Sequence, residues 1–350
     1  MSHIAGVEKV LAPYRHAQGD ITRLARACLP DANGALLERV HASARVSHRH
    51  TALPLDAYPG LDGFGGRNEA FVAAAVRMGA DAVSGGLRAA GVAPDEVDLL
   101  MFVSTTGLAA PSIDARLVER LGLRADVKRL PVFGLGCAAG AAGIGRLHDY
   151  LCGWPEHVAV LLSVELCSLT FRRTDPSPAN LVGTALFGDG AAAVVARGEG
   201  RRPAPGEGPA VVASRSRLYP GTERAMGWDV ADDGFGIVLD PGIPDIVRAH
   251  LAADVDQFLA DHKLTRDDIG AWVCHPGGPK VLMTMAETLA LPDGALDITW
   301  RSLAAIGNIS SASVLHVLRD TMDRRPPAGT WGLLTALGPG FASELVLLRW

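Results

Sequence analysis

Short apolar runs alternate with longer, alanine-rich stretches along most of this chain of 350 residues. The runs at 97–104, 158–165 and 191–196 have the length and composition of buried strands. The stretches 68–90 and 138–151 are long enough, and rich enough in small apolar residues, to be helices. This alternation predicts an α/β architecture in which helices cover a sheet.

A weak internal repeat divides the chain. "PDEVDLLMFVSTTG" (94–107) resembles "RDDIGAWVCHPGG" (266–278), and at nearly the same offset Cys137 of "GLGCAAGAAGIGRLHDYL" meets Asn308 of "AIGNISSASVLHVLRDTM". A third match pairs "TALFGDGAAAVVA" from Thr184 with "TALGPGFASELVLL" from Thr335. The shared order predicts two similar halves, 1–210 and 211–350, packed face to face so that equivalent helix starts converge. Segment 197–210, rich in Pro, Gly and Arg, is either a surface connection between them or a disordered insertion.

Composition and charge exclude several classes of protein. No apolar run approaches the roughly 20 residues that cross a membrane, and "MSHIAGVEKV" lacks the basic flank and apolar core of a signal peptide. A net charge of −5 with scattered Lys and Arg does not favour nucleic acid. The five cysteines are far apart and form no C-x-x-C pair, so we expect free thiols, a cytoplasmic location and no membrane span.

Cys137 stands at the start of the small-residue stretch, directly after an apolar run. A thiolate at a helix start lies near unpaired N–H groups and the positive end of the dipole, which lowers its pKa and favours a nucleophile. The small residues that follow predict very close packing of this helix, because glycine is costly in an unpacked one. Two alternatives remain: a filler cysteine, and a dinucleotide loop of the G-x-G-x-x-A type with Glu165 as its acid.

His275 and Asn308 are the candidate partners of Cys137. His275 ends an apolar run at "HPGG", where the chain must turn, and Asn308 precedes a serine-rich helix start that it could also cap. A Cys/His/Asn set in this order is also found in thiol proteases, but the C-G-S-C-W signature is absent. His48 and His50 form an H-x-H pair without further ligands, so we expect no metal site.

Eight motifs together identify a family resemblance. They are "STTGLAAPS", "GLGCAAGAAG", "SVELCSLTF", "ALFGDGAAAVV", "GFGIVLDPGIP", "HPGGPKVL", "GNISSASVL" and "LGPGFASELVLL". In this order the chain from about Arg45 to Trp350 resembles the type III polyketide synthases, the chalcone-synthase-like branch of the thiolase fold. The resemblance implies a thiolase-like αβαβα layered fold and a homodimer. Leu337 departs from the family's "GFGPG" and is expected to alter the cavity floor.

The resemblance also implies a chemistry and assigns its residues. Cys137 would accept an acyl group from coenzyme A, held as a thiolate by His275. His275 and Asn308 would then donate hydrogen bonds to the thioester oxygen of malonyl-CoA during decarboxylation. Phe187 and Phe235 match the two gate positions between CoA tunnel and cavity, and Arg45 and Arg49 are candidates for the CoA phosphates. No cofactor is expected beyond these CoA thioester substrates.

Substrate choice is assigned to the cavity lining. The positions that match it are Thr105, Thr106, Ala110, Cys167, Thr170 and Ser310. Ala110 and Cys167 are smaller or less polar than their counterparts in plant members, which predicts an aliphatic acyl-CoA starter and an alkylpyrone or alkylresorcinol product. Starter length, extender, number of extensions and cyclisation are left open. The alternatives are a 3-oxoacyl-acyl-carrier-protein synthase III, which condenses once, and a catalytically silent partner of the same fold.

Overall fold

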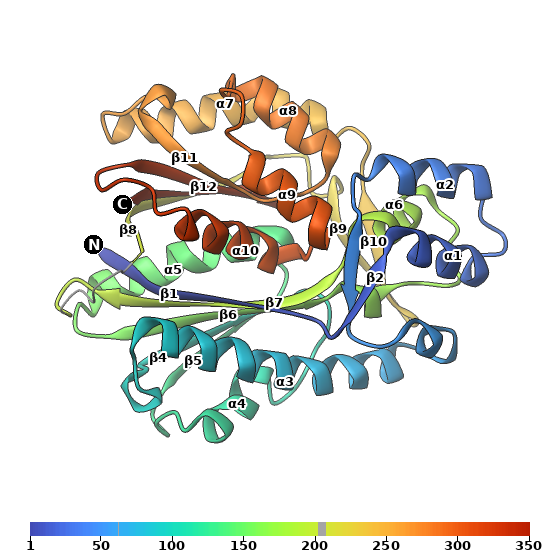
Figure 1. The fold of residues 1–350 in the computed structure, drawn as a ribbon, viewed down its shortest axis with the longest axis horizontal. Helices are drawn as coiled ribbons and strands as arrows, with labels where there is room; N and C mark the ends of the chain where they lie inside the picture. The colour runs from blue at the N-terminus through green and yellow to red at the C-terminus, as the bar shows by residue number, and fades with distance from the viewer. Residues whose placement is uncertain (62, 202–207) are drawn as a thin grey trace.

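The long strands of the computed structural model form one continuous sheet with two parts, called the first and the second sheet, whose strand orders repeat one another (Figure 1). The structure describes residues 1–61, 63–201 and 208–350. The first sheet has the order β5-β4-β6-β7-β1 and the second the order β11-β12-β13-β8. Their strands are β1 (Ser2–Leu11), β4 (Leu99–Val103), β5 (Lys128–Val132), β6 (Val158–Leu166), β7 (Asp189–Gly198), β8 (Ala210–Leu218), β11 (Ile269–Cys274), β12 (Trp331–Gly338) and β13 (Ala342–Arg349).

Strand directions repeat as well. β4 is parallel to β6, which is antiparallel to β7, which is antiparallel to β1. In the second sheet β11 is parallel to β12, β12 is antiparallel to β13, and β13 is antiparallel to β8. Strand β4 therefore corresponds to β11, as the sequence repeat predicts. In the described residues the two sheets are joined through the first residues of β1, where Ser2 and His3 pair with Val211 and Ala210 of β8.

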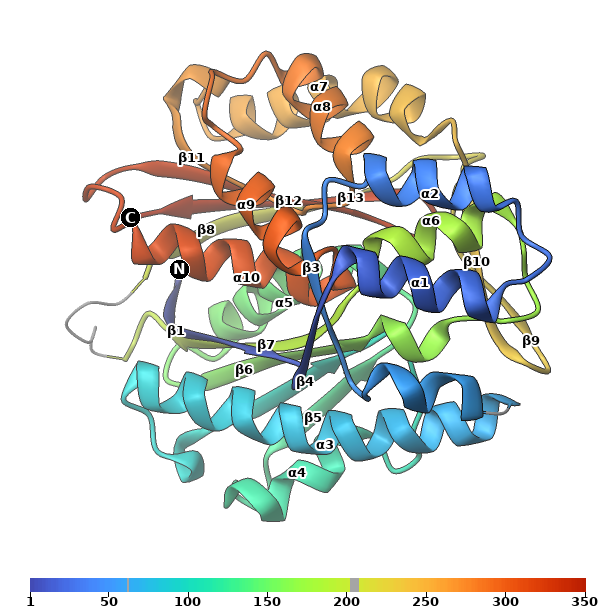
Figure 2. The same ribbon diagram turned by 45° about the vertical axis from the view of Figure 1, so that its right-hand side comes forward.

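Helices fill three further layers, which gives the expected αβαβα arrangement (Figures 1 and 2). The central pair, between the sheets, is α5 (Ala139–Gly153) and α10 (Ser310–Asp323). The pair that covers the first sheet is α3 (Gly63–Ala90) and α4 (Ile113–Leu121). The pair that covers the second sheet is α7 (Ile243–Asp261) and α8 (Pro279–Leu289). The thiolase-like fold predicted from the sequence is therefore confirmed.

The central helices pack with their backbones in contact. A Cβ atom added at Gly140 of α5 would lie 2.8 Å from Val314 Cγ1 of α10 and nearer still to the Ser311 carbonyl oxygen. On its other side, a Cβ at Gly143 would lie 2.6 Å from Leu161 of β6. Glycine is therefore required at both positions, and the close packing predicted from the small-residue stretch is confirmed.

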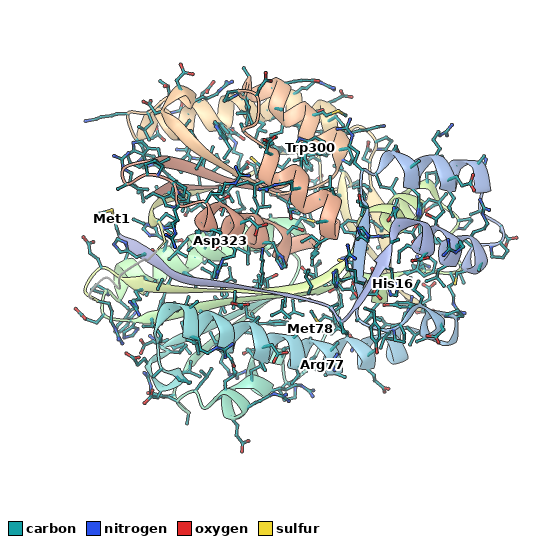
Figure 3. The ribbon with its side chains drawn as sticks, in the orientation of Figure 1. Met1, His16, Arg77, Met78, Trp300 and Asp323 are labelled. Atoms are coloured by element: carbon teal, nitrogen blue, oxygen red, sulfur yellow. The ribbon has the colours of Figure 1, made fainter. Side chains whose placement is uncertain are left out.

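Helix α3 is long and apolar enough to cross a membrane by length and composition, but most of its apolar window is buried. It packs against β1, β6 and β7. Met78 is buried, whereas its neighbour Arg77 is exposed and points away from the sheet (Figure 3). This amphipathic pattern identifies α3 as a core helix of a layered fold.

A smaller group of elements gathers at one end of the layers, on the right of Figures 1 and 2. It contains β2 (Tyr14–Ala17), β3 (His48–Thr51), β9 (Met226–Ala231), β10 (Gly234–Leu239), α1 (Gln18–Cys28), α2 (Gly34–Ser43) and α6 (Pro178–Leu186), with α9 (Asp297–Ile306) nearby. The half boundary expected after residue 210 falls at the start of β8 and stays a prediction. The connection expected at 197–210 lies partly outside the described residues, since 202–207 are not among them.

Candidate active site

A cavity of about 720 Å³ brings most of the predicted site residues together at this end of the layers. Its lining comes from both halves of the chain and from the β9–β10 hairpin. The predicted residues that line it are Arg45, Thr105, Thr106, Cys137, Cys167, Phe187, His275, Asn308 and Ser310. Leu337, which departs from the family motif, lines it too.

Cys137 is presented by a single 3₁₀ turn, Gly136–Ala138, that leads into α5. Gly136 has φ 47°, and a Cβ there would lie 2.5 Å from Pro339, so glycine fits this tight approach between the two halves. The Cys137 thiol donates to Ser310 Oγ, at 3.6 Å, on the first turn of α10. The convergence of the two helix starts predicted from the repeat is therefore confirmed.

His275 follows the last residue of β11 and extends its pairing, because its N–H donates to the Thr335 carbonyl at 2.9 Å. Gly277 and Gly278 then turn the chain into α8, and Gly278 has φ 143°. The His275 side chain is 4% exposed, and neither ring nitrogen has a hydrogen-bond partner among the described residues. Both nitrogens are thus available to a ligand in the cavity.

Asn308 is fixed by its backbone and by one end of its amide. Its Oδ1 accepts from Ser310 N at 2.8 Å, but the cap residue of α10 is Ile309, so Asn308 lies one residue before the cap position, which the sequence suggests for it. Because Oδ1 is occupied, Nδ2 is left to donate; it has a long contact, 3.4 Å, with the Gly277 carbonyl oxygen, and a hydrogen bond from the Asn308 side chain lowers the pKa of the Cys137 thiol. A second N–H of this amide can therefore be donated to a substrate oxygen.

Burial opposes a lone charge on either member of the Cys137–His275 pair. It raises the pKa of the Cys137 thiol to about 12, against the hydrogen bond to Ser310, which favours the thiolate. It lowers the pKa of His275 to about 3. The pKa lowering expected for Cys137 from its helix start is therefore wrong, because desolvation of the buried thiol outweighs the hydrogen bonds that favour the thiolate.

Glu165, considered above only as a dinucleotide acid, instead organises the cavity wall. It is fully buried at the end of β6 and accepts from Thr105 N at 3.0 Å and from Thr106 Oγ1 at 2.9 Å. Its other oxygen accepts from Ser311 Oγ of α10. Burial raises the pKa of Glu165, and these hydrogen bonds oppose the rise. A carboxyl group closing a wholly apolar strand was the sequence signal for such a network, because a buried carboxyl needs donors.

Three predicted lining residues lie elsewhere. Ala110 is exposed and does not line this cavity, so the expectation that it forms a wall for the tail is not supported. Thr170 and Phe235 line a smaller adjoining chamber of about 80 Å³. Phe235 packs against Phe64, at 5.2 Å between ring centroids, and beside Trp228, at 5.9 Å, so its gate role stays a prediction.

Two residues that the sequence analysis missed form part of the wall between cavity and chamber. Trp228 of β9 and Ile237 of β10 are paired across the hairpin and line both spaces. The Trp228 indole N–H donates to Thr105 Oγ1 at 3.0 Å, which ties the hairpin to the first sheet. Bulk at this wall limits how far a bound chain can extend from Cys137.

The two arginines assigned to CoA phosphates have different surroundings. Arg45 is exposed at the cavity mouth, with its guanidinium 5.0 Å from the centre of the Trp300 ring (Trp300 is labelled in Figure 3). Lys280 also lines the mouth and adds a second cation. Arg49 is only 3% exposed, so it cannot reach a phosphate in solvent, and its assignment to CoA is not supported.

His48 and His50, the H-x-H pair of the sequence, lie on β3 away from the lining of the cavity. His50 Nδ1 contacts the Ala12 carbonyl oxygen at 2.6 Å, on the strand pair β2–β3. Among the described residues no group of three or more His, Cys, Asp or Glu side chains could hold a metal ion.

Known proteins are similar in sequence to nearly the whole length of this chain. Residues 37–200 match the family described as "Chalcone and stilbene synthases, N-terminal domain", and residues 210–350 match its C-terminal domain. The 1,3,6,8-tetrahydroxynaphthalene synthase of Streptomyces peucetius subsp. caesius is 59% identical over 99% of this chain and 93% of its own length.

Solved structures agree with the sequence comparisons. The 1,3,6,8-tetrahydroxynaphthalene synthase of Streptomyces coelicolor A3(2), described as a bacterial type III polyketide synthase, superimposes with a TM-score of 0.94 at 30% identity over 99% of both chains. PKS-I from the brown alga Ectocarpus siliculosus superimposes with a TM-score of 0.93 at 29% identity, over 99% of this chain and 98% of its own.

Proposed function

Because this chain belongs to the chalcone and stilbene synthases, the type III polyketide synthases, we propose that it builds a polyhydroxylated naphthalene from malonyl-CoA alone. The chain is an acyltransferase-type enzyme that catalyses decarboxylative condensation of CoA thioesters. This family assignment selects the polyketide synthase among the alternatives raised by the sequence. What remains to be proposed is the role of each residue, the starter and the product.

Cys137 acts as the nucleophile of acyl loading. Its sulfur attacks the thioester carbonyl while its proton passes to His275, and the departing CoA sulfur takes that proton back. Because burial raises the pKa of the Cys137 thiol, a proton acceptor beside it favours the attack. Loading leaves an acyl group on Cys137 and releases CoA.

Extension uses His275 and Asn308. Their N–H groups donate to the thioester oxygen of malonyl-CoA, which carries the negative charge when the C–C bond to the carboxylate breaks and CO₂ leaves. The enolate carbon then attacks the acyl carbon on Cys137, and the cysteine sulfur departs. The lengthened chain, now on CoA, returns to Cys137 for the next round.

The 59% identity with a tetrahydroxynaphthalene synthase carries the product proposal. The skeleton in that name is an unbranched set of two-carbon units with oxygen on alternate positions, and it has no alkyl chain. We propose that malonyl-CoA, as both starter and extender, supplies every carbon. The hydroxyls of Thr105 and Ser310, which accept hydrogen bonds from Trp228 and Cys137, are left to donate to such an oxygen-rich chain.

The aliphatic starter expected from the sequence is not supported. That expectation depended on Ala110 and Cys167 as walls of the cavity; Cys167 lines it, but Ala110 lies outside it. The bulk of Trp228 and Ile237 stands where an extended tail would pass from the cavity to the adjoining chamber. A compact, folded polyketide suits the space better than a straight alkyl chain.

Purified enzyme given malonyl-CoA alone tests the proposal. We expect an aromatic product with the mass of tetrahydroxynaphthalene or its oxidised form by mass spectrometry, and no such product from Cys137→Ala. Malonyl-CoA labelled with ¹³C should label every carbon of the ring system. Turnover only when a fatty acyl-CoA is added would overturn the malonyl starter while leaving the synthase assignment intact.

We also propose that two copies associate. Strand β5 is at the end of its sheet, with β4 as its one neighbour in the described sheet, and exposed apolar side chains lie on and beside it. They include Leu130, 43% exposed, and Phe133, 47% exposed. A free strand edge with an apolar rim is a ready site for pairing with a second copy. Light scattering after size exclusion should give twice the mass of one chain.

A further inference from the structure

A buried arginine contacts the segments that carry Phe187 and Asn308. Arg49 of β3 is 3% exposed, and its Nη1 donates to the Phe187 carbonyl oxygen at 2.8 Å. Its Nε and Nη2 have no hydrogen-bond partner among the described residues. Placing a guanidinium in the interior with two nitrogens unpaired is costly, and burial lowers the pKa of Arg49; the negative charge of Asp189 nearby opposes this and offsets part of the cost.

The segment held by Arg49 in turn holds Asn308. Asn308 N donates to the Leu186 carbonyl at 2.8 Å, and Gly188 N donates to the Asn308 carbonyl at 2.9 Å. Phe187 and Asn308 thus form a short parallel bridge. Both backbone hydrogen-bonding groups of Asn308 are fixed to residues that flank the carbonyl bound by Arg49.

The arginine stem also packs beside the residue before Asn308. A Cβ atom added at Gly307 would lie 3.1 Å from Arg49 Cγ and 3.2 Å from Arg49 Cδ, so the stem leaves no room there for a side chain. Gly307 has φ 72°, a conformation that sets the direction in which Asn308 leaves α9. One side chain therefore touches both strands of the bridge that carries Asn308.

We propose that Arg49 is a positioning residue for the decarboxylation step, holding the Asn308 amide at the place where the malonyl thioester oxygen binds. This inference rests on the role proposed above for Asn308. Cys137 is carried by the turn before α5, and its thiol is bound by Ser310 Oγ and by the Asn308 side chain, so Arg49 reaches Cys137 only through Asn308. Losing Arg49 should therefore lower decarboxylation far more than the reactivity of Cys137, which keeps its hydrogen bond to Ser310.

The test compares Arg49→Met and Arg49→Lys with the wild type. For each protein, kcat and KM for conversion of malonyl-CoA to acetyl-CoA are measured, together with the rate of Cys137 alkylation by iodoacetamide and Tm. Displacing a catalytic group by about 1 Å costs up to about a hundredfold. We expect Arg49→Met to lower kcat about tenfold to a hundredfold, with alkylation within about twofold of wild type. The charged, flexible stem of Arg49→Lys should restore part of kcat.

Arg197→Met is the matched control, because Arg197 is also buried, at 9% exposure, and also donates to a carbonyl oxygen, that of Ala90. It lies outside the cavity lining, so its loss should change Tm and leave kcat unchanged. Should Arg49→Met fail to fold, Arg49→Gln, which keeps a donor on a shorter stem, is measured in its place with the same expectation.

Three outcomes overturn the inference. Wild-type kcat in Arg49→Met or Arg49→Gln is one, and a fall in kcat matched by equal falls in the alkylation rate and in Arg197→Met is another. Asn308→Ala is measured alongside to separate the two proposals. If Asn308→Ala loses decarboxylation while the Arg49 variants keep it, the positioning role alone is wrong. If Asn308→Ala keeps it, the role of Asn308 is wrong and the inference falls with it.

Discussion

Replacing Gly140 with alanine tests whether the contact between α5 and α10 sets the geometry of the active site. The new methyl group would lie 2.8 Å from Val314 Cγ1 and nearer still to the Ser311 carbonyl oxygen. Carbon atoms in contact prefer about 3.5–4.0 Å. The helices would have to separate by roughly the difference, about 1 Å.

That separation has two measurable effects. Overpacking a core costs about 1–3 kcal/mol, and the upper end of that range applies here because the Ser311 carbonyl belongs to a helix and cannot rotate aside. The starts of the same helices carry Cys137 and Asn308, so a shift of about 1 Å also misaligns the two and costs up to about a hundredfold in turnover.

Urea denaturation gives the free energy of unfolding, and polyketide formation from malonyl-CoA gives the turnover. Gly153→Ala is the control in the same helix, because a Cβ there meets no atom within 4 Å. It should change stability by less than about 1 kcal/mol, since alanine favours a helix over glycine, and it should leave turnover unchanged. If Gly140→Ala matches Gly153→Ala in both measurements, the packing argument is refuted.

Three other predictions follow from single contacts. Cys137→Ala should lose acyl loading, seen as the absence of an acyl-enzyme mass, whereas Cys152→Ala, at an exposed cysteine, should keep it; an acyl-enzyme in Cys137→Ala would contradict the mechanism. Burial raises the pKa of Asp189 from 3.8 to about 6, so the folded state binds this proton more tightly than the unfolded state. The unfolding free energy of wild type relative to Asp189→Asn should therefore fall by roughly 3 kcal/mol as pH rises from about 3 to about 7, about 2 kcal/mol of it between pH 4 and 6; a flat difference in urea melts would exclude it. Trp228→Ala should join cavity and chamber and so raise kcat/KM for hexanoyl-CoA relative to malonyl-CoA, unless the indole plays no part in the wall.

The sequence predicted the parts of the fold that depend on local pattern. The run at 158–165 became β6, each residue of which is buried, and the small-residue stretch became α5. The repeat correctly paired Cys137 with Asn308, because the two helix starts occupy equivalent places in the halves. Helix α3 begins five residues before the expected Asn68, since tertiary packing overrides the low helix propensity of its first glycines.

The local sequence pattern could not predict the register of the strands or how deeply a side chain is buried. In β10 the side chains of Phe235 and Ile237 share a face, and only the pairing with β9 decides that Ile237 meets Trp228 at the cavity. Arg49 has the pattern of a surface charge in "SHRHT", yet its strand β3 packs against α9 and β7. Its burial depends on segments far along the chain, which no local pattern reveals.

The place of β1 bears on how the chain reaches this structure. Ser2–Leu11 emerges first during synthesis, but it pairs along its whole length with β7, Ser2 opposite Gly198, and its first residues pair with β8. Nearly two hundred residues must therefore be synthesised before the partners of this strand, which lies at the junction of the two sheets, are available. Long-range pairing of this kind slows folding and leaves an unpaired apolar strand open to wrong partners. While the chain is being synthesised, its central strand β1 is therefore still unpaired and exposed to the ribosome and to chaperones.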